Sequence, residues 1–260
     1  MTDRVVTRHR AGRAAYLTIN RPEQRNALSN EVFTELRAGL ADAKEDSEVR
    51  AVVLAGAGDR AFCSGGDLRQ MGDDGNGLQA HRGRAGLAGV IRDLWELGKP
   101  TIARVQGYAL AGGFGLAAAC DFVVASDRAT FGVPEVGVGL WPYMITVPMV
   151  RSMLPKHALE LMLTARVVGA EEAERKGFVT RVVPHDQLDT AVDELVTVLA
   201  SRSPAVMRLG RDSFYAVWDV AADAALEHLH AMLTLTNQTE DAAEGIAAFL
   251  DKRPPRWRGR

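Results

Sequence analysis

The chain has 260 residues, of which 47% are hydrophobic, and its 31 basic and 33 acidic side chains give a formal net charge of −2. This length suits one large unit with a full core, and the near-neutral charge argues against a nucleic-acid-binding or disordered protein. The apolar stretches are broken well before the roughly 20 residues that a membrane span needs, and the two cysteines provide no disulfide framework. We therefore expect a cytoplasmic protein with neither nucleic acid nor a membrane as a partner.

The first sixty residues predict a hairpin, a helix and a buried strand. Residues 5–8 and 15–20 are strand-like runs joined by a turn that contains glycine, as in a β-hairpin. A helix is expected to begin near Ser29 or Asn30, either of which can cap it, because the apolar positions that follow share one face. Residues 51–55 are entirely apolar, which is typical of a strand covered on both faces.

The middle of the chain continues with alternating strands and helices. Residues 72–86 are rich in Gly, Asp, Asn and Arg, and we expect a mobile loop there. An amphipathic helix follows at residues 87–95 and is expected to end before Gly98. The apolar runs at residues 101–105 and 122–125 predict two further strands.

The last third of the chain is mainly helical in pattern. Residues 170–176 suggest a short helix, and from about residue 188 the pattern is helical as far as residue 250. These elements predict an α/β core at residues 1–190 and a C-terminal helical region at residues 191–260.

Two glycine-rich turns each follow an apolar strand: Phe62-Cys63-Ser64-Gly65-Gly66-Asp67 and Ala111-Gly112-Gly113-Phe114-Gly115. Loops without bulky side chains can direct backbone N–H groups at one oxygen that gains negative charge, and the Ser64 and Gly112 amides are our candidates. If Gly112 begins a helix, its N–H has no partner within that helix. The plainer alternative is that these glycines serve only tight turns and helix packing.

Other catalytic patterns fit the chain less well. No serine lies in a Gly-x-Ser-x-Gly motif, and no histidine pair has metal-ligand spacing, so we expect no metal. Gly56-x-Gly58-x-x-Ala61 resembles a dinucleotide fingerprint, which would make the protein a nicotinamide-dependent oxidoreductase. A helix should then open directly after these glycines, but Ser64, Gly65 and Gly66 interrupt it.

Several segments together resemble the enoyl-CoA hydratase/isomerase (crotonase) family. The resemblance rests on Asn20-Arg21-Pro22 with Arg25-Asn26-Ala27-Leu28, on both glycine turns, on Phe131-Gly132-Val133-Pro134-Glu135-Val136-Gly137, and on Phe249-Leu250-Asp251-Lys252-Arg253. These segments occur in the family's order along nearly the whole chain. The resemblance implies a spiral of ββα units, C-terminal helices that build a homotrimer or a dimer of trimers, and an acyl-CoA thioester as substrate.

The resemblance also assigns roles to residues of this chain. Glu135 would be the acid/base, with a pKa raised by its apolar surroundings, and the Ser64 and Gly112 amides would hold the thioester oxygen. Coenzyme A would be part of the substrate, with no separate cofactor. Its path would be lined by Arg25, Ala27, Leu28, Ser64, Gly65, Gly66, Asp67, Leu68 and Gly112, with Phe249 and Lys252 at its nucleotide end in the same or a neighbouring subunit.

One position departs from the family's pattern. Typical enoyl-CoA hydratases hold water between two glutamates, and this chain has Gly115 where the second one falls. A single carboxylate suffices to move a proton along an unsaturated thioester, so the residues favour double-bond isomerisation, whereas hydration is the commoner family activity. A catalytically weak acyl-CoA-binding protein that keeps the fold is the alternative from another class.

Overall fold

The structure is a computed structural model that describes residues 4–67 and 85–260. Its larger sheet has six strands, in the order β1 (Val6–Ala11), β2 (Ala14–Ile19), β3 (Ala51–Gly56), β5 (Thr101–Val105), β7 (Phe122–Ser126) and β10 (Arg181–Val183). β1 and β2 form the predicted hairpin, and every other pairing in this sheet is parallel. The expected strands at residues 51–55, 101–105 and 122–125 are therefore confirmed.

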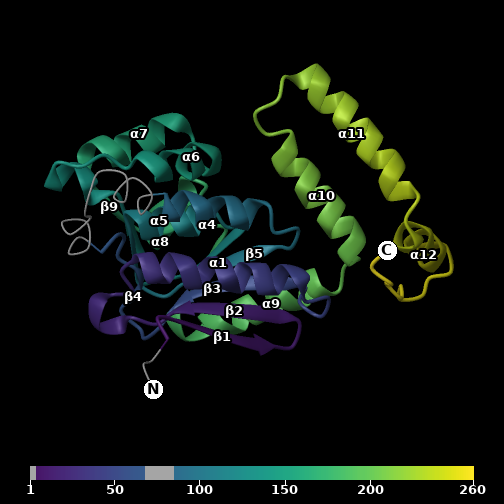
Figure 1. Ribbon diagram of the computed structural model, residues 1–260, viewed down its shortest axis with the longest axis horizontal. Coiled ribbons are helices and arrows are strands. Elements are labelled where there is room, and N and C mark those ends of the chain that lie inside the picture. Colours follow the sequence, from purple (N-terminus) through teal and green to yellow (C-terminus); the bar gives the residue numbers. More distant parts are fainter. Residues whose placement is uncertain (1–3, 68–84) are drawn as a thin grey trace.

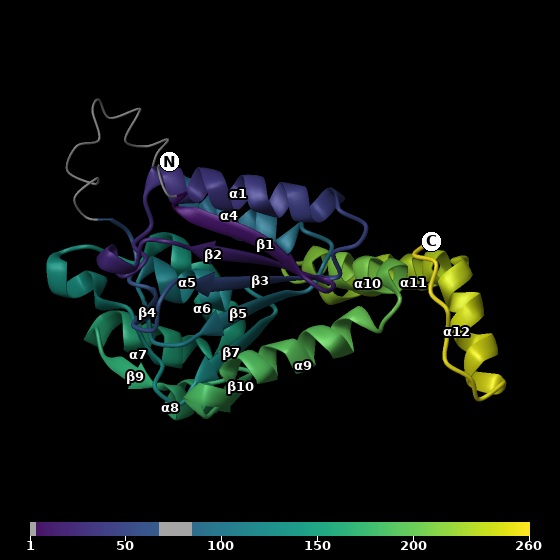
Figure 2. The same cartoon turned by 90° about the horizontal axis from the view of Figure 1, so that it is seen from below.

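Helices cover both faces of this sheet. α1 (Asn30–Glu45) begins after Ser29, whose side chain accepts a hydrogen bond from Val32 N, so the predicted cap is confirmed. α1 and α4 (Gly86–Trp95) lie on one face, and α9 (Leu188–Ala200) lies on the other (Figure 2). β3 is buried along its whole length because alternate side chains enter the two cores on either side of it.

A second, smaller sheet is built from four strands of three residues each. Its order is β4 (Ala61–Cys63), β6 (Tyr108–Leu110), β8 (Thr130–Gly132) and β9 (Val167–Gly169). β4, β6 and β8 run parallel, and each directly follows a parallel strand of the larger sheet, whereas β9 closes the edge as an antiparallel strand. This alternation is the spiral expected from the resemblance.

The remaining helices of the core are short. They are η1 (Pro22–Gln24), α5 (Gly112–Ala118), η2 (Pro134–Val138), α6 (Tyr143–Ser152), α7 (Pro155–Thr164), α8 (Ala170–Arg175) and η3 (His185–Gln187). α5 begins at Gly112, as the sequence predicts. The loop expected at residues 72–86 lies outside the described residues, except for residues 85 and 86 at the start of α4.

The C-terminal helices extend away from the core in both views (Figures 1 and 2). They are α10 (Pro204–Ala216), α11 (Ala222–Asn237) and α12 (Glu240–Leu250). α11 buries none of its residues and exposes a row of leucines on one face: Leu226, Leu229 and Leu233. Among the residues that the structure describes, no helix is long and apolar enough to cross a membrane.

The end of the chain folds back onto α12. The carboxylate of the fully buried Asp241 accepts hydrogen bonds from the backbone N–H groups of Arg258 and Gly259 and from the Ser203 hydroxyl. Trp257 donates its indole N–H to the carbonyl of Ser201. The tail therefore contributes to the junction of α9, α10 and α12.

α10 is attached to the core through Asp121, which follows α5. The Asp121 carboxylate accepts hydrogen bonds from Arg211 Nε at 2.8 Å, from Tyr215 Oη at 2.6 Å and from Thr101 N at 2.7 Å. The Arg211 side chain is 8% exposed, and it also donates to the carbonyls at the end of α4. This ion pair is thus largely removed from water.

Replacing Asp121 by Ala should destabilise the fold by about 3–5 kcal/mol, because it leaves the buried Arg211 guanidinium without its counter-charge. Urea unfolding of the purified variant measures this loss. Asp42→Ala is the matched control, since Asp42 pairs with Arg8 while 77% exposed, and its effect should stay below about 1 kcal/mol. Equal effects of the two substitutions would contradict the importance of the Asp121 pair.

Candidate active site

The carboxyl ends of three neighbouring strands carry the three segments that the sequence singles out. Ser64, Gly65 and Gly66 follow β4, Gly112 follows β6, and Glu135 follows β8. Because β4, β6 and β8 are parallel and adjacent, their carboxyl ends meet at one edge of the smaller sheet. The Ala111 N–H donates to the carbonyl of Gly132 at 2.9 Å and ties the second segment to the third.

The two glycine turns touch each other. Gly65 has a φ of +97°, and a Cβ atom on it would lie 2.6 Å from Ala111 Cβ and 3.3 Å from Gly112 N. A Cβ on Gly113 would lie 2.3 Å from the carbonyl oxygen of Cys63. Side chains at these positions would force the turns apart, so glycine is required for their contact.

The Ser64 amide is not available as a donor, and our expectation for it was wrong. Its N–H donates to the carbonyl of Arg25 at 3.0 Å. The amide of Gly66, two residues further along, is in a different position. Leu28 forms a parallel bridge with Gly66, in which the Leu28 N–H donates to the Gly65 carbonyl and the Leu28 carbonyl accepts from the Asp67 N–H. In such a bridge the intervening residue, Gly66, directs its own N–H to the opposite side. Within the described part of the chain, the Gly66 N–H has no hydrogen-bond partner.

The Gly112 amide lies at the first position of α5. The residue before it, Ala111, has a φ of +50° and provides no side-chain cap. No described residue accepts a hydrogen bond from the Gly112 N–H, as is usual in the first turn of a helix. The two turns therefore offer two free amides, those of Gly66 and Gly112, of which sequence analysis identified one as a donor.

Glu135 is a half-buried carboxylate in η2 with one oxygen that has no partner. Its Oε2 is buried and makes no hydrogen bond with any residue in the described ranges. Burial raises the pKa of Glu135 above its ordinary value of 4.5, as the sequence predicts, and a backbone hydrogen bond offsets part of this effect. A carboxyl group in such a setting can exchange a proton nearer to neutral pH than an exposed glutamate.

The side chain of Ile145 fills the space beside Gly115. A Cβ atom on Gly115 would lie 2.0 Å from Ile145 Cγ2 and 2.5 Å from Ile145 Cβ. Ile145 is buried in α6, which packs directly against α5. A second glutamate at residue 115 is thus excluded by packing, and an apolar group stands beside this position.

The segment that precedes α1 holds the first glycine turn in place. Arg25 and Asn26 both have positive φ values, and the buried Asn26 amide donates to the carbonyls of Ala57 and Ala61. Arg21 pairs with Asp67 at 2.8 Å. Three residues expected along the coenzyme A path, Arg25, Ala27 and Leu28, are thereby brought to this turn. Asp67 is part of the turn, and Leu68 lies outside the described residues.

Phe249 and Lys252 do not join this site within one chain. They lie at the end of α12, on the far side of the molecule from β4 and α5 (Figure 2). Phe249 is 83% exposed. A role for these residues at the same site therefore requires a second subunit.

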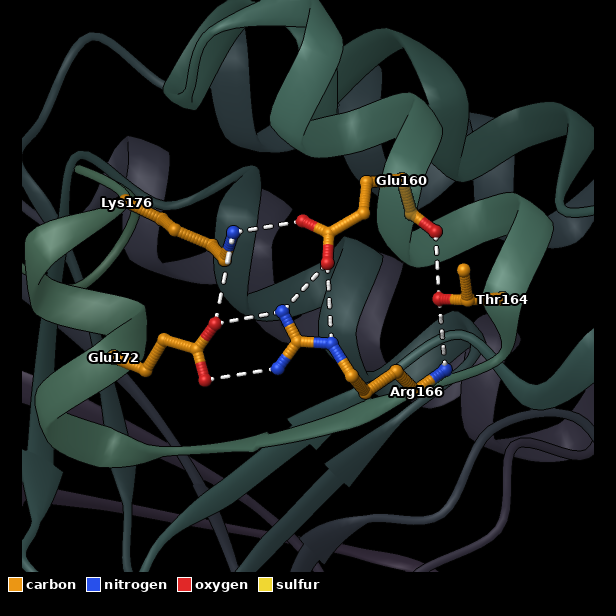
Figure 3. A network of polar contacts seen from close by, with 5 residues as sticks. All are labelled: Glu160, Thr164, Arg166, Glu172 and Lys176. Atoms are coloured by element: carbon orange, nitrogen blue, oxygen red, sulfur yellow. Dashed lines mark hydrogen bonds and ion pairs between the residues drawn. The ribbon is translucent and has the colours of Figure 1, made fainter.

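An ion-pair network braces the outer edge of the smaller sheet (Figure 3). Arg166 donates to Glu160 of α7 at 2.6 Å and to Glu172 of α8 at 2.7 Å, and Lys176 donates to Glu160 at 2.9 Å. The hydrogen bonds from Lys176 and Arg166 lower the pKa of Glu160 to about 2. The network joins α7 to α8 around β9, and α7 packs against the η2 turn that carries Glu135.

Other kinds of catalytic group are not found in the described ranges. No three His, Cys, Asp or Glu side chains among residues 4–67 and 85–260 are placed to hold a metal ion. Cys63 and Cys120 are free and buried, and burial raises the pKa of the Cys63 thiol to about 12. That thiol is therefore neutral at physiological pH and is a poor nucleophile.

The chain is similar to known proteins over almost its whole length. The family model described as enoyl-CoA hydratase/isomerase matches residues 10–260. A probable enoyl-CoA hydratase of Mycobacterium bovis is 33% identical over 258 residues that cover 99% of each chain. The 2,3-dehydroadipyl-CoA hydratase of Escherichia coli is 34% identical over 269 residues that cover both chains completely. The crystal structure of an enoyl-CoA hydratase of Mycobacterium smegmatis has a TM-score of 0.94 at 33% identity and covers 97% of this chain and 98% of its own.

Adding one methyl group at Gly113 should separate the two turns. Gly113→Ala is expected to destabilise the protein by about 1–3 kcal/mol, because its Cβ would overlap the Cys63 carbonyl. Urea unfolding measures the change. Gly210→Ala in α10 is the control, since nothing lies within 4 Å of its Cβ, and it should stabilise by about 0.5–1 kcal/mol. A Gly113 variant as stable as the Gly210 variant would show that the turns do not need their close contact.

Proposed function

The chain belongs to the enoyl-CoA hydratase/isomerase family, and we propose that it acts on the double bond of an unsaturated acyl-CoA thioester with Glu135 as acid/base. The observation that carries this proposal is the buried Glu135 oxygen without a partner. A carboxylate removed from water without compensating hydrogen bonds costs stability, and a group in that condition at the edge of two open turns is poised to accept a proton.

The free amides supply the second part of the chemistry. The thioester oxygen gains negative charge when a proton leaves the adjacent carbon, and the Gly66 and Gly112 N–H groups are the donors that we assign to it. The loss of one such donor typically costs about 2.7–4 kcal/mol of transition-state stabilisation. The contact between Gly65 and Gly112 supports their joint action because it brings the two turns together.

The coenzyme A part of the substrate would run beside the first turn. Arg25, Ala27 and Leu28 border this turn, and the Arg21–Asp67 ion pair stiffens it. Phe249 and Lys252 would reach the nucleotide end from a neighbouring subunit in a trimer or dimer of trimers. The uncovered leucines of α11 support such an assembly, because a row of exposed apolar side chains is typical of a surface that a partner covers.

The surroundings of Gly115 favour isomerisation over hydration. Ile145 cannot hold or polarise a water molecule, so Glu135 is the one carboxylate that we assign to the reacting carbons. Its carboxylate would take the proton from C2 of a 3-enoyl thioester, and the electron pair would enter a dienolate held by the two amides. The same carboxyl group would then return the proton to C4 and give the 2-enoyl thioester. Hydration with a single carboxylate is the alternative, and the names of the relatives favour it.

Replacing Glu135 by Gln should lower kcat by about 100- to 10,000-fold, which is the usual contribution of a general acid/base. The assay follows the conjugated thioester chromophore with 3-enoyl-CoA and with 2-enoyl-CoA as separate substrates. For the unchanged protein, kcat/KM should fall as the pH drops through the raised pKa of Glu135, at a midpoint above 4.5, because the base must be ionised. Glu194→Gln on the exposed side of α9 is the control and should keep full activity.

Thermal unfolding separates this loss from misfolding. A carboxyl group whose pKa is raised by folding costs stability at pH values above that pKa. Glu135→Gln should therefore unfold at a higher temperature than the unchanged protein at pH 8, with a smaller difference toward pH 5. Full activity of this variant would overturn the assignment of Glu135. Fast loss of 2-enoyl absorbance would favour hydration, and binding without turnover of either substrate would indicate an acyl-CoA-binding protein.

The assignment of the amide donors predicts a contrast between residues 64 and 66. Incorporating the corresponding α-hydroxy acid turns one backbone N–H into an ester oxygen. At residue 66 this change should lower kcat/KM by about 100- to 1,000-fold and leave stability almost unchanged. At residue 64 it should cost about 0.5–1.5 kcal/mol of stability, through the lost bond to Arg25, with little effect on kcat/KM. The reverse pattern would return the donor role to Ser64.

A further inference from the structure

A cavity of about 570 Å³ lies where the α/β core meets the C-terminal helices. Its walls come from the end of α1 and the following loop (residues 44–50), from residues 97–100, from the α9–α10 junction, and from Arg258 and Gly259 of the tail. None of these residues belongs to the site around Glu135. The volume falls within the range of about 300–1,000 Å³ that is typical of small-molecule sites.

The walls of this junction cavity are strongly basic. Among the described residues that line it, the carboxylates are Glu45 and Glu48, and Glu48 is paired with Arg13. The basic side chains outnumber them by six to two: Lys44, Arg50, Lys99, Arg202, Arg208 and Arg258. Such an imbalance in a partly enclosed space favours an anion.

Four of the six basic groups already have partners. Lys44 donates to the carbonyl of Glu96, and Lys99 donates to the carbonyls of Ala43 and Asp46 at the end of α1. Arg208 pairs with Asp212, and Arg258 pairs with Glu240. These four groups line the walls and add to the positive potential, but part of their hydrogen-bonding capacity is already taken up by these partners.

Arg50 and Arg202 are different. Neither guanidinium makes a hydrogen bond or ion pair with any residue in the described ranges. Arg50 belongs to the core, in the loop between α1 and β3, whereas Arg202 lies in the turn between α9 and α10. Burial lowers the pKa of Lys99; the charges of Arg50 and Arg208 also lower it, whereas those of Asp46 and Glu45 raise it.

The start of α10 adds to this preference for an anion. Pro204 and Ala205 line the cavity at the first turn of this 13-residue helix, and Ser203 caps the Val206 N–H. The positive end of the helix dipole therefore faces the same space as the two free guanidinium groups.

We propose that the junction cavity binds a small phosphate-bearing anion, which Arg50 holds from the core and Arg202 holds from the C-terminal helices. The planar fork of a guanidinium group matches two phosphate oxygens at once. The bound anion would bridge the loop before β3 and the α9–α10 turn, in addition to the Asp121 contacts that attach α10 to the core. This site is independent of the chemistry proposed for Glu135.

Inorganic pyrophosphate is the probe that tests the site. Calorimetric titration of the full chain, at an ionic strength held constant with sodium chloride, should show saturable binding of one molecule per chain. Arg50→Met and Arg202→Met should each weaken binding about ten- to a hundredfold, as expected for the loss of a charged hydrogen-bonding partner. Arg175→Met on the surface of α8 makes the same change of charge elsewhere and should leave the affinity unchanged.

Two further arms distinguish this site from the proposed active site. Pyrophosphate should bind equally well to the Glu135→Gln variant and to a Lys252→Met variant, which removes the cation assigned to the nucleotide end of coenzyme A. The absence of saturable binding, or an unchanged affinity in the Arg50→Met/Arg202→Met double variant, would overturn the proposal. Loss of binding in the Lys252→Met variant would likewise overturn it, because it would place pyrophosphate at the coenzyme A path.

Discussion

The parallel pairing of β4, β6 and β8 is the constraint on which the candidate site depends. Each strand is only three residues long, yet their hydrogen bonds bring together loops from residues 64–66, 111–113 and 133–135. The buried Gln106 side chain strengthens this arrangement, because it donates to the carbonyls of Gly56 and Ala61 and so joins the two sheets at their common edge. A shift of any of these strands by one residue would redirect the amides and the carboxylate together.

The buried carboxylates differ in the hydrogen bonds that they accept, and this difference distinguishes the structural carboxylates from the candidate catalytic one. Asp121 and Asp241 each accept several hydrogen bonds and hold helices in place. Glu135 differs from them, because one of its oxygens is buried and accepts no hydrogen bond from any described residue. Such an arrangement lowers stability and raises the pKa, as expected for the acid/base role proposed for Glu135.

The two ends of the molecule differ in packing and in charge. At the edge of the smaller sheet, Ile145 occupies the space next to Gly115 and leaves Glu135 as the single acid/base of the proposed reaction. At the opposite end, where the core meets the C-terminal helices, Arg50 and Arg202 form no ion pair with any residue that the structure describes. Both features depend on contacts between elements that are distant in the sequence.

The sequence alone determined the five longer strands of the larger sheet, because their strand-like runs are five or six residues long, and it located the two glycine turns and Glu135. It could not reveal β4, β6, β8 and β9, since three residues are too few for an alternating pattern. Only the tertiary structure decided which amide is free, because the bridge from Leu28 and the bond to Arg25 set the direction of each N–H in the first turn. It likewise decided that Gly115 faces Ile145 rather than open space, and that Phe249 and Lys252 lie far from Glu135 within one chain. The physical reason is the same in each case: the direction of a hydrogen bond and the occupant of a space are set by residues far away along the chain.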